Sequence, residues 1–87
     1  MNDDAAARAA DAIADLDRRS VEHVRNAIAT VTRVIEENRR LAARFPDHAA
    51  SAHERILEGE GELATFEVEL AALEARIAAR DQEQRSA

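Results

Sequence analysis

The stretch Phe45-Pro46-Asp47-His48 decides the fold, because it interrupts an otherwise continuous helical pattern. Pro46 has no backbone N–H and disfavours helical geometry at Phe45, so a helix that reaches this point should end. The other 83 residues are rich in Ala, Arg, Glu and Leu and contain two Gly, a composition typical of long helices. We therefore predict an all-α chain, a single helical hairpin over residues 1–87. Its first helix should cover about 4–44, its turn about 45–50 and its second helix about 51–84.

The start of the second helix has two candidate caps. Ser51 is followed three residues later by Glu54, the spacing of a capping box, in which hydroxyl and carboxylate accept hydrogen bonds from free amides at the helix start. Asp47 is a rival N-cap. The sequence predicts a cap at one of these two positions.

Both predicted helices carry a heptad pattern of apolar residues, which we call the seam. Residues at alternating steps of three and four lie along one side of a helix and pack against another helix. A short turn makes the two helices antiparallel, so the hairpin should resemble an antiparallel coiled coil. The seam consists of Val21, Val24, Ile28, Val31, Ile35, Asn38, Ala42 and Phe45, and of Ile56, Gly59, Leu63, Phe66, Leu70, Leu73 and Ile77.

The seam and the flanking charges predict one register. Folding the chain back at Asp47 puts Ile35 opposite Gly59, where the missing side chain would let the helices approach closely. The edges beside the seam agree, because an arginine edge meets a glutamate edge. These edges are Arg18, Arg25 and Arg39, and Glu60, Glu67 and Glu74. Nearer the termini Asp17 would oppose Ile77, so we expect the ends to be frayed or packed through alanines.

A second apolar row on each helix predicts association beyond the hairpin. Rows at heptad spacing widen the apolar face, as in helices buried on more than one side. They consist of Ile13, Ala27, Val34 and Leu41, and of Leu57, Ala64, Ala71 and Ala78. We predict a homodimer that forms a four-helix bundle, or a hairpin that completes its core on a partner protein, with a monomeric hairpin as the alternative. The predicted apolar interface is Val34, Leu41, Leu57 and Val68.

Catalytic and metal-binding patterns are absent from the sequence. A helical zinc motif needs a second histidine four residues after the first, and Leu57 takes that position after His53-Glu54. Cysteine is absent, no glycine-rich phosphate loop occurs, and a two-helix hairpin offers no deep pocket. We therefore expect a protein that is not an enzyme and has no catalytic residues, no metal site and no cofactor.

The charge is unevenly distributed along the chain. Residues 1–46 hold eight acidic and eight basic side chains, whereas residues 47–87 hold ten acidic side chains and four arginines, which gives the whole net charge of −6. The plain interpretation is pairing between glutamates and arginines of the hairpin. The functional interpretation is a negative ridge that covers a basic nucleic-acid-binding site on a target enzyme, steered by its field. The ridge would consist of Glu54, Glu58, Glu62 and Glu69.

Direct nucleic-acid binding is disfavoured by the acidic charge, the absence of lysine and the two aromatic residues. No run of about 18 apolar residues predicts a membrane span, and the acidic N-terminus does not resemble a secretory signal. We therefore expect a cytoplasmic protein. All twelve basic residues are arginine, which indicates the codon bias of a GC-rich bacterial or phage genome.

Length and hairpin layout are similar to those of the WXG100 secretion substrates, small helical hairpins that dimerise. The Trp-x-Gly turn of that family is missing, since the turn here is Phe45-Pro46-Asp47-His48 and the chain has no tryptophan. Size and acidic charge are also similar to those of small phage inhibitors such as anti-CRISPR proteins, a class without a common motif.

Overall fold

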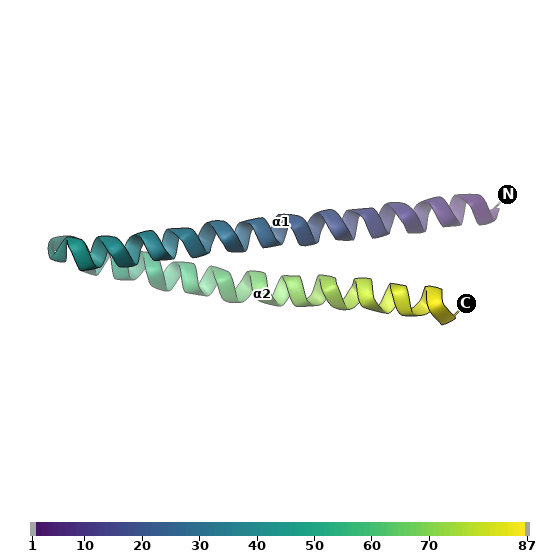
Figure 1. Cartoon of the computed structure of the whole chain (residues 1–87). Coiled ribbons are helices and arrows are strands. Elements are labelled where there is room, and N and C mark those ends of the chain that lie inside the picture. Colours follow the sequence, from purple (N-terminus) through teal and green to yellow (C-terminus); the bar gives the residue numbers. More distant parts are fainter. Residues whose placement is uncertain (1, 87) are drawn as a thin grey trace.

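Two long helices run antiparallel and lie against each other along their length (Figure 1). The structure is a computed structural model that describes residues 2–86; Met1 and Ala87 of the predicted single domain lie outside this range. Helix α1 covers Asn2–Arg44, the 3₁₀ turn η1 covers Pro46–His48, and α2 covers Ala49–Ser86. The hairpin is a rod of 68 × 19 × 13 Å in which the start of α1 and the end of α2 lie at the same end. The predicted helical hairpin is confirmed.

The turn forms as Pro46 requires, but the second helix begins differently from the prediction. Phe45 has φ −126° and ψ 88°, an extended geometry that suits the residue before a proline. Pro46 then opens a 3₁₀ turn that runs directly into α2 at Ala49. Ser51 already lies inside α2, where its hydroxyl donates to the His48 carbonyl at 3.1 Å. The predicted capping box is therefore wrong, and among the side-chain hydrogen bonds of residues 2–86 none involves Asp47, the rival N-cap.

Phe45 does not extend the seam as predicted. Its side chain is 46% exposed and packs locally, edge-on to the His48 ring at 6.3 Å and beneath the Arg44 guanidinium at 5.7 Å. The chain has to leave the helix at this residue, so its side chain turns away from the line of the seam. Phe45 therefore covers the turn instead of the core.

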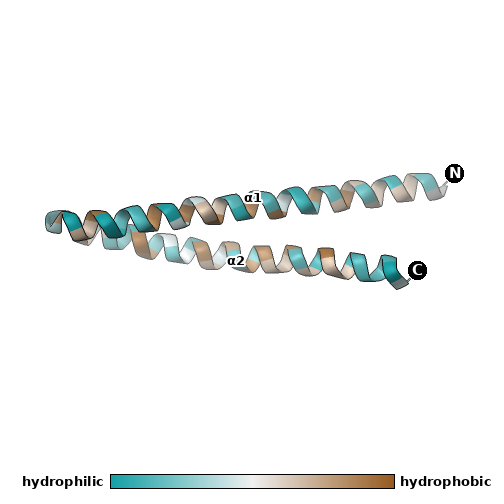
Figure 2. Ribbon diagram, viewed as in Figure 1, coloured by the Kyte–Doolittle hydropathy of each residue, from teal (hydrophilic) through white to brown (hydrophobic). Residues whose placement is uncertain are grey.

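The core is a single thin seam. Its buried apolar residues are Val21, Val24, Ile35, Ala52 and Ile56, and its buried polar residues are Asp17 and Asn38. Hydropathy alternates along both helices, so that neither is apolar all round (Figure 2). On α2 the residues of the seam from Leu63 to Ile77 are only half-buried. Because α2 packs against one helix only, much of its apolar surface stays exposed to solvent.

The predicted register is confirmed at its tightest point. Gly59 is buried, and a Cβ atom placed on it would lie 2.7 Å from Cγ1 of Ile35 and 3.5 Å from Cγ1 of Val31. Asn38 is buried at the next level, where its side-chain amide donates to the Val34 carbonyl at 2.8 Å. The absent side chain of Gly59 therefore lets the helices approach closely near the turn.

Candidate docking surface

One edge of the seam is bridged by ion pairs between the helices, and we call it the paired edge. Arg25 lies 3.6 Å from Glu74 and Arg39 lies 3.5 Å from Glu60. These are two of the pairs that the charge pattern predicted. At the heptad position between the two arginines stands Thr32, so Glu67 lacks a basic residue at its level. Each exposed pair contributes little free energy, so the paired edge chiefly selects the register.

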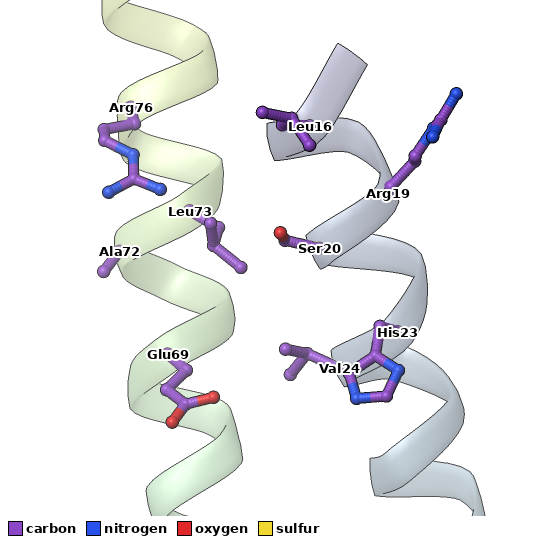
Figure 3. A pocket seen from close by; sticks show the side chains of 9 residues that line it. All are labelled: Leu16, Arg19, Ser20, His23, Val24, Glu69, Ala72, Leu73 and Arg76. Atoms are coloured by element: carbon purple, nitrogen blue, oxygen red, sulfur yellow. The ribbon is translucent and has the colours of Figure 1, made fainter. Parts of the chain in front are cut away.

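The opposite edge is open and forms a shallow groove along the hairpin. The groove consists of three hollows that overlap in sequence. The first and second share His23, and the second and third share Thr30 and Glu62, so the groove is continuous from Leu16 to Val34. The floor of the groove is made of residues of the seam: Val24, Val31, Phe66 and Leu73. Figure 3 shows one end of the groove, where Val24 and Leu73 point between the helices and Leu16 points from α1 towards α2.

Arg19 lines the α1 side of the groove together with residues that have no formal charge. Six of these uncharged residues form what we call the uncharged row. They repeat at steps of four and three, the spacing of one helix face. The row consists of Leu16, Ser20, His23, Ala27, Thr30 and Val34. Leu16 is 59% exposed and Val34 42%, and Ile13, one turn before Leu16, is also exposed. A large part of the apolar surface of α1 therefore faces solvent on this edge.

The α2 side of the groove carries three exposed carboxylates, Glu58, Glu62 and Glu69, which we call the Glu row. Arg55 and Arg76 line the same side, seven residues before Glu62 and seven residues after Glu69. Among residues 2–86, no ion pair links the Glu row to an arginine or histidine. Two of the arginines that line the groove pair elsewhere, Arg19 with Asp15 and Arg76 with Asp17. The two edges of the hairpin therefore differ: on the paired edge Glu60 and Glu74 pair with arginines of α1, whereas within residues 2–86 the Glu row makes no ion pair across the groove.

Four of the eight residues predicted to bind a partner lie together at the groove: Val34, Glu58, Glu62 and Glu69. The other four do not line it. Leu41 is half-buried towards the turn, and Leu57 lies on α2 one turn before Glu60, on the side of the paired edge. Val68, 71% exposed, and Glu54 lie on the outer face of α2, away from the seam. The two predicted apolar rows thus lie on different sides of the hairpin.

The sequence prediction missed Leu16, Ser20, His23 and Thr30 as part of the surface. A signal for them was present, because the positions at steps of four and three from Leu16 to Val34 all lack charge. An apolar criterion alone does not find this row, since Ser, His and Thr interrupt it. A search for uncharged positions on one helix face would have identified it.

An ion cluster around the buried Asp17 joins the helices near the termini, where fraying was expected. The Asp17 carboxylate is nearly covered and accepts hydrogen bonds from Arg80 at 2.9 Å and from Arg76 at 3.0 Å. The hydrogen bond from Arg80 lowers the pKa of Asp17; burial opposes this shift, and the charge and hydrogen bond of Arg76 add to it. Asp17 therefore joins α1 to α2 as a charged residue, and the predicted weak end of the seam is bridged.

Neither helix of the described residues has a stretch long and apolar enough to cross a membrane. Within residues 2–86, no three His, Asp or Glu side chains gather closely enough to hold a metal ion. Comparison with known proteins adds no relative: no family model matches the chain, and neither a curated protein nor a solved structure is similar to it. The chemistry of the groove is therefore the basis for a function.

Proposed function

We propose that this chain is a non-enzymatic protein-interaction module whose groove takes up a further helix. The observation that carries the proposal is the apolar floor, open from Leu16 to Val34 and continuous between the helices. The added helix belongs to another protein or to a second hairpin, which would make a four-helix bundle. In either case it lies along the groove and covers the half-buried residues of α2.

The dimensions of the groove suit one helix. Leu16 and Val34 are 18 positions apart on α1, which is about 27 Å at the rise of an α-helix. A partner helix of roughly 18 to 20 residues spans that length. Each 100 Å² of apolar area that it buries contributes about 2.5 kcal/mol before the cost of association. The exposed side chains of Leu16 and Val34 and the half-buried ring of Phe66 supply such area.

The Glu row supports a second candidate, an acidic inhibitor that covers a basic nucleic-acid-binding site on an enzyme. Glu54, Glu58 and Glu62 follow one another at steps of four along α2, which gives a nearly continuous ridge. Binding of this kind depends on charge, so it weakens over the range in which salt screens exposed charges. Docking on the apolar floor persists at high salt.

The experiment is a comparison of solution mass by light scattering at low and high salt, with one change inside the groove and one outside. Val34→Glu puts a charge on the uncharged row, whereas Val68→Glu puts the same charge on the outer face. A salt-resistant dimer that Val34→Glu dissociates and Val68→Glu preserves supports docking of a second copy. Where the wild-type chain is a monomer, binding of an apolar helical peptide should show the same difference. Equal effects of both changes contradict the groove as the interface.

A further inference from the structure

We propose that the occupant of the groove is a second copy of the chain, placed antiparallel about a twofold axis that crosses both helices at the level of Arg25 and Glu69. This inference rests on the proposed function and adds the identity of the partner, its direction and its register. In this arrangement α1 lies along α1 of the other copy and α2 along α2, so each helix of the bundle has two antiparallel neighbours. Two observations, one on each helix, place the axis at the same level.

The first observation is the order of charges along the groove side of α2. The residues at every seventh position from Arg55 lie on this side, and we call them the charged line. It consists of Arg55, Glu62, Glu69 and Arg76, which line the groove, and of Glu83 beyond its end. Figure 3 shows Glu69 and Arg76 on α2 at one end of the groove.

A twofold axis at Glu69 brings opposite charges of the two copies together. Glu62 of each copy lies opposite Arg76 of the other, because both are seven residues from the axis. Arg55 lies opposite Glu83 in the same way, at fourteen residues from the axis. Symmetry doubles both contacts, so four pairs of opposite charge stand against one contact between the two Glu69 side chains.

Other positions of the axis match fewer charges. Half a heptad nearer the turn, Glu62 meets Glu69 and Arg55 meets Arg76, so like charges face each other. Half a heptad nearer the termini, Glu69 meets Arg76 but Glu62 meets Glu83, which cancels the gain. An axis along the rod would instead lay the charged line over the uncharged row and leave Glu62 and Glu69 facing residues without charge.

The second observation is the spacing of the uncharged row on α1. Its six residues follow at steps of four, three, four, three and four, an order that is the same in both directions about position 25. An axis at this position sets each member of the row opposite another member. The facing pairs are Leu16 with Val34, Ser20 with Thr30, and His23 with Ala27.

The register of the hairpin makes these two positions one level. Gly59 lies against Ile35, and ten residues further along each helix Arg25 of α1 and Glu69 of α2 lie at the same height. This level is within two residues of the middle of both helices, since α1 covers Asn2–Arg44 and α2 covers Ala49–Ser86. Two hairpins joined here overlap along nearly their whole length, and each covers the groove floor of the other.

The charged line has the capacity to pair between copies. Among the ion pairs of residues 2–86, none involves Arg55, Glu62, Glu69 or Glu83, and all four are exposed. Arg76 donates to Asp17, yet 62% of its side chain stays exposed and its guanidinium has further N–H donors. A second copy therefore supplies partners that the single hairpin does not.

The first test is a charge swap between Arg55 and Glu83, with the Kd of the dimer measured by sedimentation at low and at high salt. Arg55→Glu or Glu83→Arg alone turns two ion pairs into like-charge contacts and should raise the Kd roughly tenfold at low salt, and less when salt screens the charges. The double variant should restore the wild-type Kd. Because the two residues are 28 positions apart on one helix, about 42 Å, only contact between copies can produce this rescue.

Two variants that lose the same single charge test the place of the axis. Glu62→Gln removes an attraction to Arg76 and should raise the Kd, whereas Glu69→Gln removes the repulsion at the axis and should lower it. Equal effects of the two changes mean that net charge and not the charged line controls association, and overturn the inference.

A cross-link gives an independent measure of the same geometry. The chain has no cysteine, so a single cysteine forms a disulfide only with its counterpart in another copy. Glu69→Cys, on the axis, should give a linked dimer under mild oxidation, whereas Val68→Cys, on the outer face, should not. Equal cross-linking of both variants places the contact outside the groove.

The remaining outcomes separate this inference from the proposed function. A dimer that Val34→Glu dissociates, but that shows neither rescue by the charge swap nor the cross-link at residue 69, leaves an interaction module and overturns this arrangement. A wild-type chain that is monomeric at every concentration also overturns it, and the proposed function then depends on the binding of the helical peptide. A dimer that Val34→Glu leaves unchanged overturns both.

Discussion

The contact between Gly59 and Ile35 gives the sharpest prediction, because α2 has a second glycine two residues away in open space. A Cβ atom added at Gly59 would lie 2.7 Å from Cγ1 and 3.0 Å from Cδ1 of Ile35, whereas one added at Gly61 would meet nothing within 4 Å. Alanine at either position removes the same backbone penalty, about 1 kcal/mol in a helix interior. The two substitutions therefore differ chiefly in the contact across the seam.

The magnitudes follow from these two terms. Gly61→Ala should raise the free energy of unfolding by about 1 kcal/mol. Gly59→Ala makes the same gain but overpacks the seam at a typical cost of about 1–3 kcal/mol, since Ile35 is buried and cannot turn into open space. The two variants should therefore differ by about 1–3 kcal/mol, which separates their melting temperatures by at least about 4 °C for a chain of this size.

The assay is thermal and urea denaturation followed by circular dichroism, at one protein concentration so that any association affects all variants alike. Ile35→Ala provides a further control, because it creates the space that a Cβ at residue 59 would fill. The double variant Gly59→Ala with Ile35→Ala should be more stable than the sum of the single effects predicts. If Gly59→Ala stabilises the chain as much as Gly61→Ala does, the helices are not in close contact here and the register is wrong.

Three further predictions concern the polar groups of the hairpin. Asp17→Asn should lower the free energy of unfolding at neutral pH. The pKa of Asp17 is lowered in the folded chain, so its carboxylate stabilises the fold above its ordinary pKa of about 4. The urea midpoints of wild type and variant should therefore converge as the pH falls below that value. Arg25→Glu should lower the free energy of unfolding by less than about 1 kcal/mol, and the swap with Glu74→Arg should restore it, with both effects fading at high salt in the same assay. Asn38→Leu should raise the free energy of unfolding by roughly 1–2 kcal/mol through added apolar burial; an unchanged or lower value would show that its amide has a stabilising role.

The heptad pattern was sufficient to predict the hairpin and its register. The large side chain of Ile35 and the absent side chain of Gly59 face each other as the sequence pattern requires. The ion pair of Arg25 with Glu74 follows from the same periodicity, because residues seven apart keep their place beside the seam. Periodic features of this kind depend on helix geometry alone and are therefore readable from sequence.

The features that the sequence prediction missed depend on the reach of side chains and on local turn geometry. Matching positions by level put Asp17 opposite Ile77, but the long side chains of Arg76 and Arg80 reach past that level from either side. The capping box at Ser51 failed because Pro46 starts a 3₁₀ turn that continues into α2 without a break. Neither outcome can be read from spacing, since both depend on atoms that approach one another only in the folded hairpin.

The groove was predicted only in part, because the sequence indicated which residues are exposed but not which of them lie on the same side of the hairpin. Val34 and the Glu row were recognised as exposed, but whether they share a side depends on which edge of each helix faces the other. In an antiparallel pair the arginine edge of α1 meets Glu60 and Glu74, so the other edges of both helices meet as well. That pairing brings the Glu row to the uncharged row and sends Leu57 to the opposite side.

The proposed docking of a helix in the groove would be coupled to the stability of the hairpin through shared residues. Phe66 and Leu73 belong to the seam and also form the floor of the groove, so a docked helix covers side chains that the hairpin itself leaves half-buried. A partner that binds only the folded chain adds RT ln(1 + [L]/Kd) to its stability, about 2.7 kcal/mol at a hundredfold excess over Kd. For a rod held by one thin seam this is a large addition. The paired edge selects which helix faces which, whereas the open edge leaves room for a third helix to complete the core.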